Sequence, residues 1–174
     1  MEQTEGSCEA ATAEATAVEL WDIYDENRQL VGRTHQRGLD LKPGDYHLVV
    51  HIWLQGSNGD FLITKRAPEK TFPNMWECTG GSAVAGDDSI TAALREVKEE
   101  TGLDFIPEQA TLVHTYSGEE FFCDVWSFVG DFGLEQIVLQ PGETVDARFV
   151  KRDEILRMME AGEFLQNPYF EQIF

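Results

Sequence analysis

The chain has 174 residues, which is enough for one well-filled core and too few for two ordinary domains. Thirteen basic residues against 32 acidic ones give a formal charge of −19, and a surface of this sign repels nucleic acid and anionic lipid. We therefore expect no nucleic-acid partner and no membrane partner. If the substrate is itself a polyanion, something must neutralise it locally, and a divalent cation would do so.

The N-terminus does not have the pattern of a secretory signal, because acidic residues stand where a positive segment belongs and no apolar run follows. Cys8, Cys78 and Cys123 cannot all pair with one another, and none forms a CxxC motif. We expect a reduced, cytoplasmic protein. The sequence does not fix the oligomeric state, and a homodimer remains open.

Residues 1–17, rich in Glu, Ala and Thr, predict a flexible acidic tail, and residues 18–174 predict one domain. Hydrophobic alternation and turn residues predict the strands. They are expected at 18–25, in a short segment after a turn at 27–32, and at 47–54, 61–66, 111–116, 121–129 and 147–150. Asn58-Gly59 predicts a hairpin turn, and 68–74 a loop.

Helical periodicity replaces alternation over residues 87–101, and two further helices are expected at 153–160 and, as a short segment, 167–174. In the first helix Asp87 or Asp88 can cap the start, and Gly102 stands where a helix C-terminal glycine belongs. Because strands and helices interleave, the fold class is α/β with a mixed sheet.

Three glutamates of this first helix, Glu96, Glu99 and Glu100, lie at i, i+3 and i+4, so their carboxylates share one face. Two carboxylates about 5–6 Å apart repel by roughly 3 kcal/mol at an effective dielectric near 20. A solvated helix face is the ordinary origin of such a cluster, with Arg95 and Lys98 relieving the repulsion. Taken alone, the cluster favours that ordinary explanation.

The residues around the cluster reverse this interpretation. Gly81 is followed by five residues and Asp87, then by seven residues and the run Arg-Glu-Val-Lys-Glu-Glu-Thr-Gly-Leu at 95–103. This segment resembles the Nudix box: glycine, five residues, glutamate, seven residues, then Arg-Glu-aliphatic-any-Glu-Glu-any-Gly-aliphatic. Only Asp87 departs from it. The matched positions would occur by chance on the order of once in 10⁶ chains of this length.

The resemblance extends from about residue 18 to about residue 162 and implies an α/β/α sandwich with a loop–helix–loop site. It further implies Mg²⁺ or Mn²⁺ as cofactor and hydrolysis of a diphosphate linkage in a small-molecule substrate. The implied metal ligands are Glu96, Glu99, Glu100 and the carbonyl of Gly80 or Gly81. Arg95 is expected to hold a glutamate in place, with Gly81, Asp87 and Gly102 as structural residues of the box.

The general base and the phosphate contacts are less constrained. Glu96 is one candidate base, and Glu143, within Pro-Gly-Glu at 141–143, is another that can equally be a charged turn residue. Lys65 and Arg66 end a strand that leads toward the site loop, so one of them is a candidate for binding phosphate. Bases at strand ends are more often simply solvated.

A second likeness is to the Nudix branch that includes isopentenyl diphosphate isomerase. It rests on the segment 20–27, on His35 and His47, and on the run Trp-Glu-Cys-Thr-Gly-Gly at 76–81. The isomerase has a Cys-Gly-His-Pro loop where this chain has Gly-Gly-Ser-Ala at 80–83, and Cys78 lies too early, in a neighbourhood that indicates packing.

The nearly intact box therefore favours hydrolysis over isomerisation. Two alternatives stay open, an isomerase acting on an allylic diphosphate and a non-catalytic module in which Asp87 marks a decaying box. The sequence leaves the organic part of the substrate open among nucleoside, sugar, prenyl and alcohol.

Overall fold

The computed structural model describes residues 18–174; the predicted tail at 1–17 and Cys8 lie outside the described residues. The strands are β1 (Leu20–Tyr24), β2 (Leu30–Gln36), β3 (His47–Gly56), β4 (Phe61–Arg66), β5 (Trp76–Glu77), β6 (Thr79–Ser82), β7 (Ala110–Ser117), β8 (Phe121–Gly130) and β9 (Thr144–Val150). The α-helices are α1 (Ser89–Thr101), α2 (Arg152–Glu160) and α3 (Phe170–Ile173), and short 3₁₀ turns lie at Pro107–Gln109 and Leu134–Gln136.

Seven of the strands form one mixed sheet, in the order β5-β4-β3-β8-β7, with β6 beside β3 and β9 beside β4. β3 and β8 run parallel along their whole length, from His47↔Phe121 to Gly56↔Gly130, whereas the other pairs are antiparallel. The opposite edge of β3 is divided, because its first half pairs with β6 and only Leu54 and Gln55 pair with β4.

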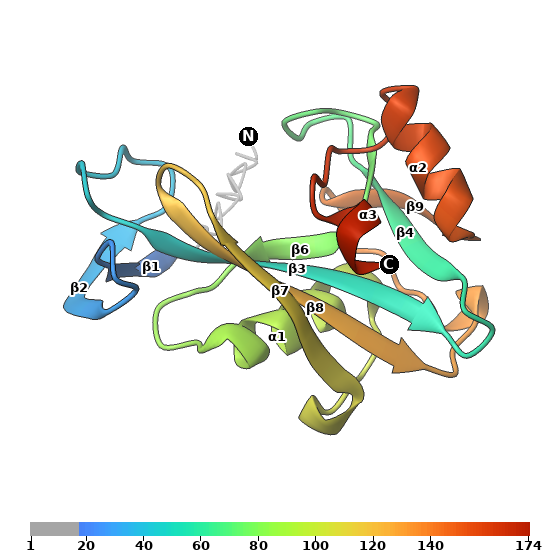
Figure 1. The fold of residues 1–174 in the computed structure, drawn as a ribbon, viewed down its shortest axis with the longest axis horizontal. Coiled ribbons are helices and arrows are strands. Elements are labelled where there is room, and N and C mark those ends of the chain that lie inside the picture. Colours follow the sequence, from blue (N-terminus) through green and yellow to red (C-terminus); the bar gives the residue numbers. More distant parts are fainter. Residues whose placement is uncertain (1–17) are drawn as a thin grey trace, which may run out of the picture.

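Helices cover both faces of this sheet, with α1 on one face and α2 and α3 on the other (Figure 1). Alternation along β3 explains the two layers: Leu48, Val50, Ile52 and Leu54 belong to the core cluster under α1, and Trp53 belongs to the cluster under α2 and α3. The predicted α/β class with a mixed sheet is confirmed, in the form of an α/β/α sandwich.

The N-terminal hairpin, β1 and β2, forms a separate two-stranded sheet that lies beside the loop before α1. The carbonyl oxygen of Leu20 accepts a hydrogen bond from Ala85 N at 2.7 Å, and Asp22 Oδ2 accepts one from Gly86 N at 2.7 Å. Arg28 makes a two-pronged ion pair with buried Asp124 on β8, at 2.9 and 2.5 Å. These contacts hold the hairpin against the loop before α1 and against β8.

Several predicted boundaries were wrong. β9 begins at Thr144 instead of 147, because Thr144 and Asp146 pair with the end of β4. α1 begins at Ser89, since Asp88 serves as its N-cap. α3 has four residues, whereas the sequence predicted helix over 167–174. The hairpin at Asn58-Gly59 is confirmed, with Gly59 at φ +88°. Among residues 18–174, no helix combines the length and the apolar character needed to cross a bilayer.

Candidate functional site

Side-chain and backbone caps fix both ends of α1. Asp88 accepts a hydrogen bond from Thr91 N at 2.9 Å, which satisfies one of the unpaired donors of the first turn. At the other end Gly102 adopts the left-handed conformation, φ +75°, and donates its N–H to the Lys98 carbonyl at 3.0 Å. A β-carbon at Gly102 would also collide with Val138. Both ends of α1 are therefore fixed, which holds its side chains in defined positions.

Arg95 connects this helix to the loop before it. Its Nε lies 3.0 Å from Asp87 Oδ2, and its Nη1 lies 3.0 Å from Glu96 Oε1 and 3.1 Å from Glu99 Oε2. Its Nη2 donates to the Ser82 carbonyl at 3.1 Å. One guanidinium thus joins three carboxylates and the end of β6. A lysine could not replace it, because its single ammonium group lacks the planar, forked set of donors.

The three box glutamates lie at different depths. The Glu99 side chain is 45 % exposed and that of Glu96 is 12 % exposed, whereas Glu100 is buried. Burial raises the pKa of Glu100 well above its ordinary value, and the nearby charges of Glu77 and Glu96 raise it further. Among residues 18–174, Glu100 Oε2 accepts one hydrogen bond, from Gly80 N at 3.4 Å. This carboxylate is therefore short of positive partners.

Gly81 has a steric reason to lack a side chain. A β-carbon there would lie inside the Glu96 carboxylate, so the glycine leaves the space that Glu96 fills. Burial also raises the pKa of Glu96 above its ordinary value, and this is opposed by the charge of Arg95. The double glycine of β6 and the glutamates of α1 are thus in direct contact.

Carboxylate and backbone oxygens at this junction are the ligands that hard divalent cations prefer. Within residues 18–174, no three His, Cys, Asp or Glu side chains are already gathered at metal-binding distance, and Arg95 holds Glu96 and Glu99. The excess of buried negative charge around Glu100 fits a cation. The donor set therefore suits magnesium or manganese, although the side chains must turn to chelate it.

A cavity of about 790 Å³ adjoins the glycines at the divided edge of β3. Its residues come from the turn after β2, from β3, the end of β4, the loop after it, the β5–β6 segment and the C-terminal segment. They include Arg37, Val49, His51, Arg66, Lys70, Phe72, Met75, Glu77, Gly80, Gly81, Leu165 and Asn167. Cationic side chains and apolar ones thus line the same cavity, which suits a molecule with an anionic part and an organic part.

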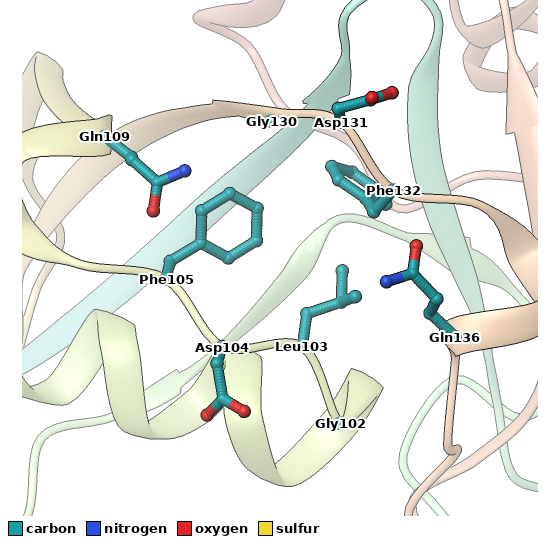
Figure 2. A pocket seen from close by; sticks show the side chains of 9 residues that line it. All are labelled: Gly102, Leu103, Asp104, Phe105, Gln109, Gly130, Asp131, Phe132 and Gln136. Carbon is teal, nitrogen blue, oxygen red and sulfur yellow. The ribbon is translucent and has the colours of Figure 1, made fainter.

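A smaller hollow of about 260 Å³ lies at the C-terminal end of α1, between the residues that follow Gly102 and the end of β8 with the residues after it (Figure 2). Phe105 and Phe132 approach each other there edge to face, with ring centroids 5.8 Å apart. The box glutamates line neither of the two hollows, but Glu100 and Glu96 contact Gly80 and Gly81, which line the larger one. We therefore take the larger cavity as the candidate functional site.

Lys65 and Arg66, the two basic residues at the end of β4, differ in their position relative to the cavity. Arg66 lines the cavity, and its Nη1 forms an ion pair with Glu77 Oε2 at 2.6 Å while its Nε donates to the Thr71 carbonyl at 2.7 Å. Lys65 does not line it; its Nζ lies 5.7 Å from the ring centre of Trp76. Because neighbouring residues of a strand point to opposite faces, only one of the two bases can reach the cavity.

Glu143 lies directly before β9, and its carboxylate pairs with Lys70. Its carbonyl oxygen accepts a hydrogen bond from Ala67 N at 2.9 Å, so the segment carrying Glu143 is tied to the start of the loop that follows β4. Its side chain is 40 % exposed. Glu143 is therefore near the cavity edge through Lys70, though it is not among the residues that line the cavity.

His35 and His47, singled out in the sequence, do not line the cavity, whereas Cys78 is one of its lining residues. His35 is partly exposed and bonds the Leu39 carbonyl at 3.0 Å. His47 stacks on Trp21, with ring centroids 4.0 Å apart, and burial lowers the pKa of His47 to about 4. Cys78 is buried in the core cluster under α2 and α3, which agrees with a packing role, and burial raises the pKa of its thiol well above the ordinary value.

Sequence reasoning missed Lys70, Glu77 and His51. Glu77 is a buried carboxylate whose Oε1 has no hydrogen-bond partner among the described residues, and burial raises its pKa. Its position between Trp76 and Cys78, an acid in an otherwise apolar segment, was the available signal. Lys70 stands in a loop of ordinary polar composition, which offered no such signal.

The chain is similar to known proteins along most of its length. The NUDIX domain family model matches residues 45–171. An uncharacterized Nudix hydrolase of Listeria monocytogenes serovar 1/2a is 40 % identical over 159 residues, covering 90 % of this chain and 94 % of the relative. Dihydroneopterin triphosphate diphosphatase of Escherichia coli K12 is 32 % identical over 74 residues, which cover 42 % of this chain and 47 % of that protein.

The crystal structure of DR0079 from Deinococcus radiodurans superposes with a TM-score of 0.73 at 22 % identity, covering 89 % of this chain and 97 % of that one. At this identity the match supports the fold alone. The predicted likeness to the isopentenyl diphosphate isomerase branch is not shown by these relatives.

Proposed function

Taking as the premise that this chain belongs to the Nudix hydrolase family, we propose that it uses Mg²⁺ or Mn²⁺ to cut the diphosphate linkage of a small organic diphosphate. The single observation that supports this most is the buried, cation-poor Glu100 carboxylate, which lies against the double glycine at the edge of a cavity lined by arginine and lysine. A solvated helix face, the ordinary explanation of clustered glutamates, does not bury its carboxylates.

In this proposal the cation is held by Glu96, Glu99, Glu100 and the carbonyl of Gly80. When bound, the ion supplies Lewis-acid polarisation of the phosphoryl oxygens and lowers the pKa of an attacking water. Arg95 is the positioning residue, since it already holds Glu96 and Glu99 within 3.1 Å. Substrate and cation would then lie next to each other at the edge of the cavity, where the chain provides both carboxylates and cationic side chains.

Arg66 and Lys70 are the proposed contacts of the substrate diphosphate, because both line the cavity. Arg66 is held on two sides, by Glu77 and by the Thr71 carbonyl, so it presents its charge with little loss of conformational freedom. Lys65 was an equal candidate from the sequence, but its position over Trp76 favours Arg66.

The proton of the attacking water goes to Glu96 or to Glu143. Glu96 lies among the proposed metal ligands, and burial raises its pKa above the ordinary value, which makes its carboxylate a stronger base. Glu143 is bound to Lys70, which lines the cavity, so a substrate phosphate that draws Lys70 away would free the Glu143 carboxylate. Comparing the pH–rate profiles of Glu96→Gln and Glu143→Gln decides between them.

The experiment that tests the proposal is a hydrolysis screen with Mg²⁺ against nucleoside diphosphate derivatives, pterin triphosphates and prenyl diphosphates, reading release of phosphate and monophosphate. Release by the parent, abolished by chelator, supports the proposal. Conversion of isopentenyl diphosphate to its allylic isomer without phosphate release would support the isomerase alternative. Binding of a diphosphate without any turnover would support the non-catalytic module.

A further inference from the structure

His51 lies in the first half of β3, on the sheet face that is covered by the C-terminal segment, and it lines the cavity together with Gly80 and Asn167. Its Nδ1 lies 2.7 Å from the Tyr169 hydroxyl oxygen. The other edge of the ring is near the double glycine, because His51 Cδ2 lies 3.3 Å from the point where a β-carbon of Gly80 would stand. The imidazole thus has one nitrogen in the core and one beside the cavity.

A chain of hydrogen bonds determines which nitrogen carries the proton. The Leu165 carbonyl can only accept, so the Asn167 atom that lies 3.2 Å from it must be the amide nitrogen, Nδ2. The other amide atom, Oδ1, then accepts from the Tyr169 hydroxyl at 3.0 Å. Tyr169 has thereby donated its only proton.

The Tyr169 oxygen can now only accept. It receives the Trp53 indole N–H at 3.4 Å, since an indole nitrogen is always a donor, and it receives His51 Nδ1–H. A neutral imidazole carries one proton only, and the accepting Tyr169 oxygen fixes that proton on Nδ1. With that proton on Nδ1, Nε2 is left as an acceptor, and no residue in 18–174 donates to it.

We propose that His51 is a specificity-determining residue of this site, whose Nε2 accepts a hydrogen bond from an N–H or O–H group on the organic part of the substrate. The inference rests on the proposed function, in which the same cavity holds a diphosphate. It favours organic parts that carry a donor, such as a base or a sugar, over isoprenoid chains. Against a prenyl chain the fixed acceptor would be desolvated without a partner.

The proton position is tested first, on the parent protein. Two-bond ¹H–¹⁵N correlation spectra of histidine-labelled protein at pH 7 should show His51 with Nδ1 protonated and Nε2 bare. In the Tyr169→Phe variant, which lacks the accepting hydroxyl, the His51 proton should no longer be confined to Nδ1. A parent spectrum with the proton on Nε2 would overturn the proposal, whatever the variants do.

The selectivity is tested by calorimetric binding of non-hydrolysable methylene-bisphosphonate analogues in Mg²⁺, one bearing adenosine and one bearing a geranyl chain. Parent protein should bind the adenosine analogue about 10-fold more tightly or better, and His51→Phe should lose about 10-fold for that analogue alone. His51→Gln, which places an amide oxygen near the Nε2 position, should restore part of the loss.

His114→Phe is the matched control, because His114 also packs against Tyr169, with ring centroids 5.8 Å apart, but does not line the cavity. It should leave the preference unchanged. Tighter binding of the geranyl analogue by the parent, or an equal loss for both analogues in His51→Phe, would reject the assignment.

Binding and turnover separate this inference from the proposed function. If the parent releases no phosphate from any diphosphate yet keeps the His51-dependent preference, the hydrolase proposal fails and the specificity assignment stands. If the parent hydrolyses diphosphates and His51→Phe keeps the parental preference, the hydrolase proposal stands and the specificity assignment fails.

Discussion

Arg95 Nε lies 3.0 Å from Asp87 Oδ2, so the aspartate that stands in place of the box glutamate reaches the arginine in spite of its shorter side chain. The contact joins the loop before α1 to the middle of the helix. The substitution is therefore compatible with an ordered site, and a decaying box is not required to explain it. This relationship gives a direct test.

Asp87→Asn should lower the free energy of unfolding by about 2 kcal/mol and reduce kcat/KM, because Arg95 loses a charged partner and holds Glu96 and Glu99 less firmly. Asp87→Glu should retain most activity. Urea unfolding and steady-state kinetics measure the two effects. An Asp87→Asn protein with unchanged stability and turnover would show that the ion pair is incidental.

Glu99→Gln and Glu100→Gln should fold at least as well as the parent without metal, since each change removes negative charge from a crowded region. Turnover should fall about 10²-fold or more, equivalent to roughly 3 kcal/mol of barrier. Glu160→Gln, at the end of α2 and exposed, is the control and should change neither property. If the two α1 variants kept parental turnover at saturating metal, the glutamate cluster would be only a solvated helix face.

Magnesium or manganese should raise the melting temperature. At 100 times the dissociation constant a ligand stabilises the folded state by about 2.7 kcal/mol, which corresponds to roughly 5–10 °C for a chain of this size. Differential scanning fluorimetry with and without chelator measures the shift, and Glu100→Gln should diminish it. Undiminished hydrolysis in excess chelator would exclude a metal mechanism.

Stability should depend on pH through His51. Burial lowers its pKa from 6.5 to about 4 in the folded protein, so between these values the unfolded chain binds a proton that the folded chain does not. The contribution is fully present above pH 6.5 and is lost as the pH falls toward 4, with a slope of at most about 1.4 kcal/mol per pH unit. His51→Gln should flatten the urea-midpoint curve over this window, and parallel curves would contradict the prediction.

Cys78→Ala should cost about 1 kcal/mol of stability, because it leaves a small void in the core cluster under α2 and α3. Hydrolytic turnover should remain, since the thiol is buried and its raised pKa makes it a poor nucleophile at neutral pH. A folded Cys78→Ala protein that binds metal but has lost all turnover would favour thiol chemistry and the isomerase alternative.

The sequence was most informative where function and local structure coincide. The box located α1, its capping glycine and its glutamates within one continuous segment, because helix periodicity and caps are local properties. It could not place Glu77, Lys70 or His51 in one cavity. Their proximity depends on how β4 and β6 divide the edge of β3, a long-range arrangement that no local pattern encodes.

The same limit explains Lys65 and Arg66. As neighbours at a strand end they were equivalent candidates, and only the pairing of β4 with β5 shows which face each takes. The start of β9 was placed too late because Thr144, Val145 and Asp146 do not alternate clearly, and their strand conformation follows from pairing with β4.

The parallel pairing of β3 with β8 also has a consequence for how the chain folds. Each of its residue pairs, from His47↔Phe121 onward, brings together segments separated by the entire β4–β7 interval, including α1. Closing so long a loop delays folding, and on the ribosome the sheet cannot be completed until residue 130 has emerged. Until then the edge of β3 that β8 occupies has no partner strand. We expect chaperone dependence in vivo to increase most for substitutions that weaken β8.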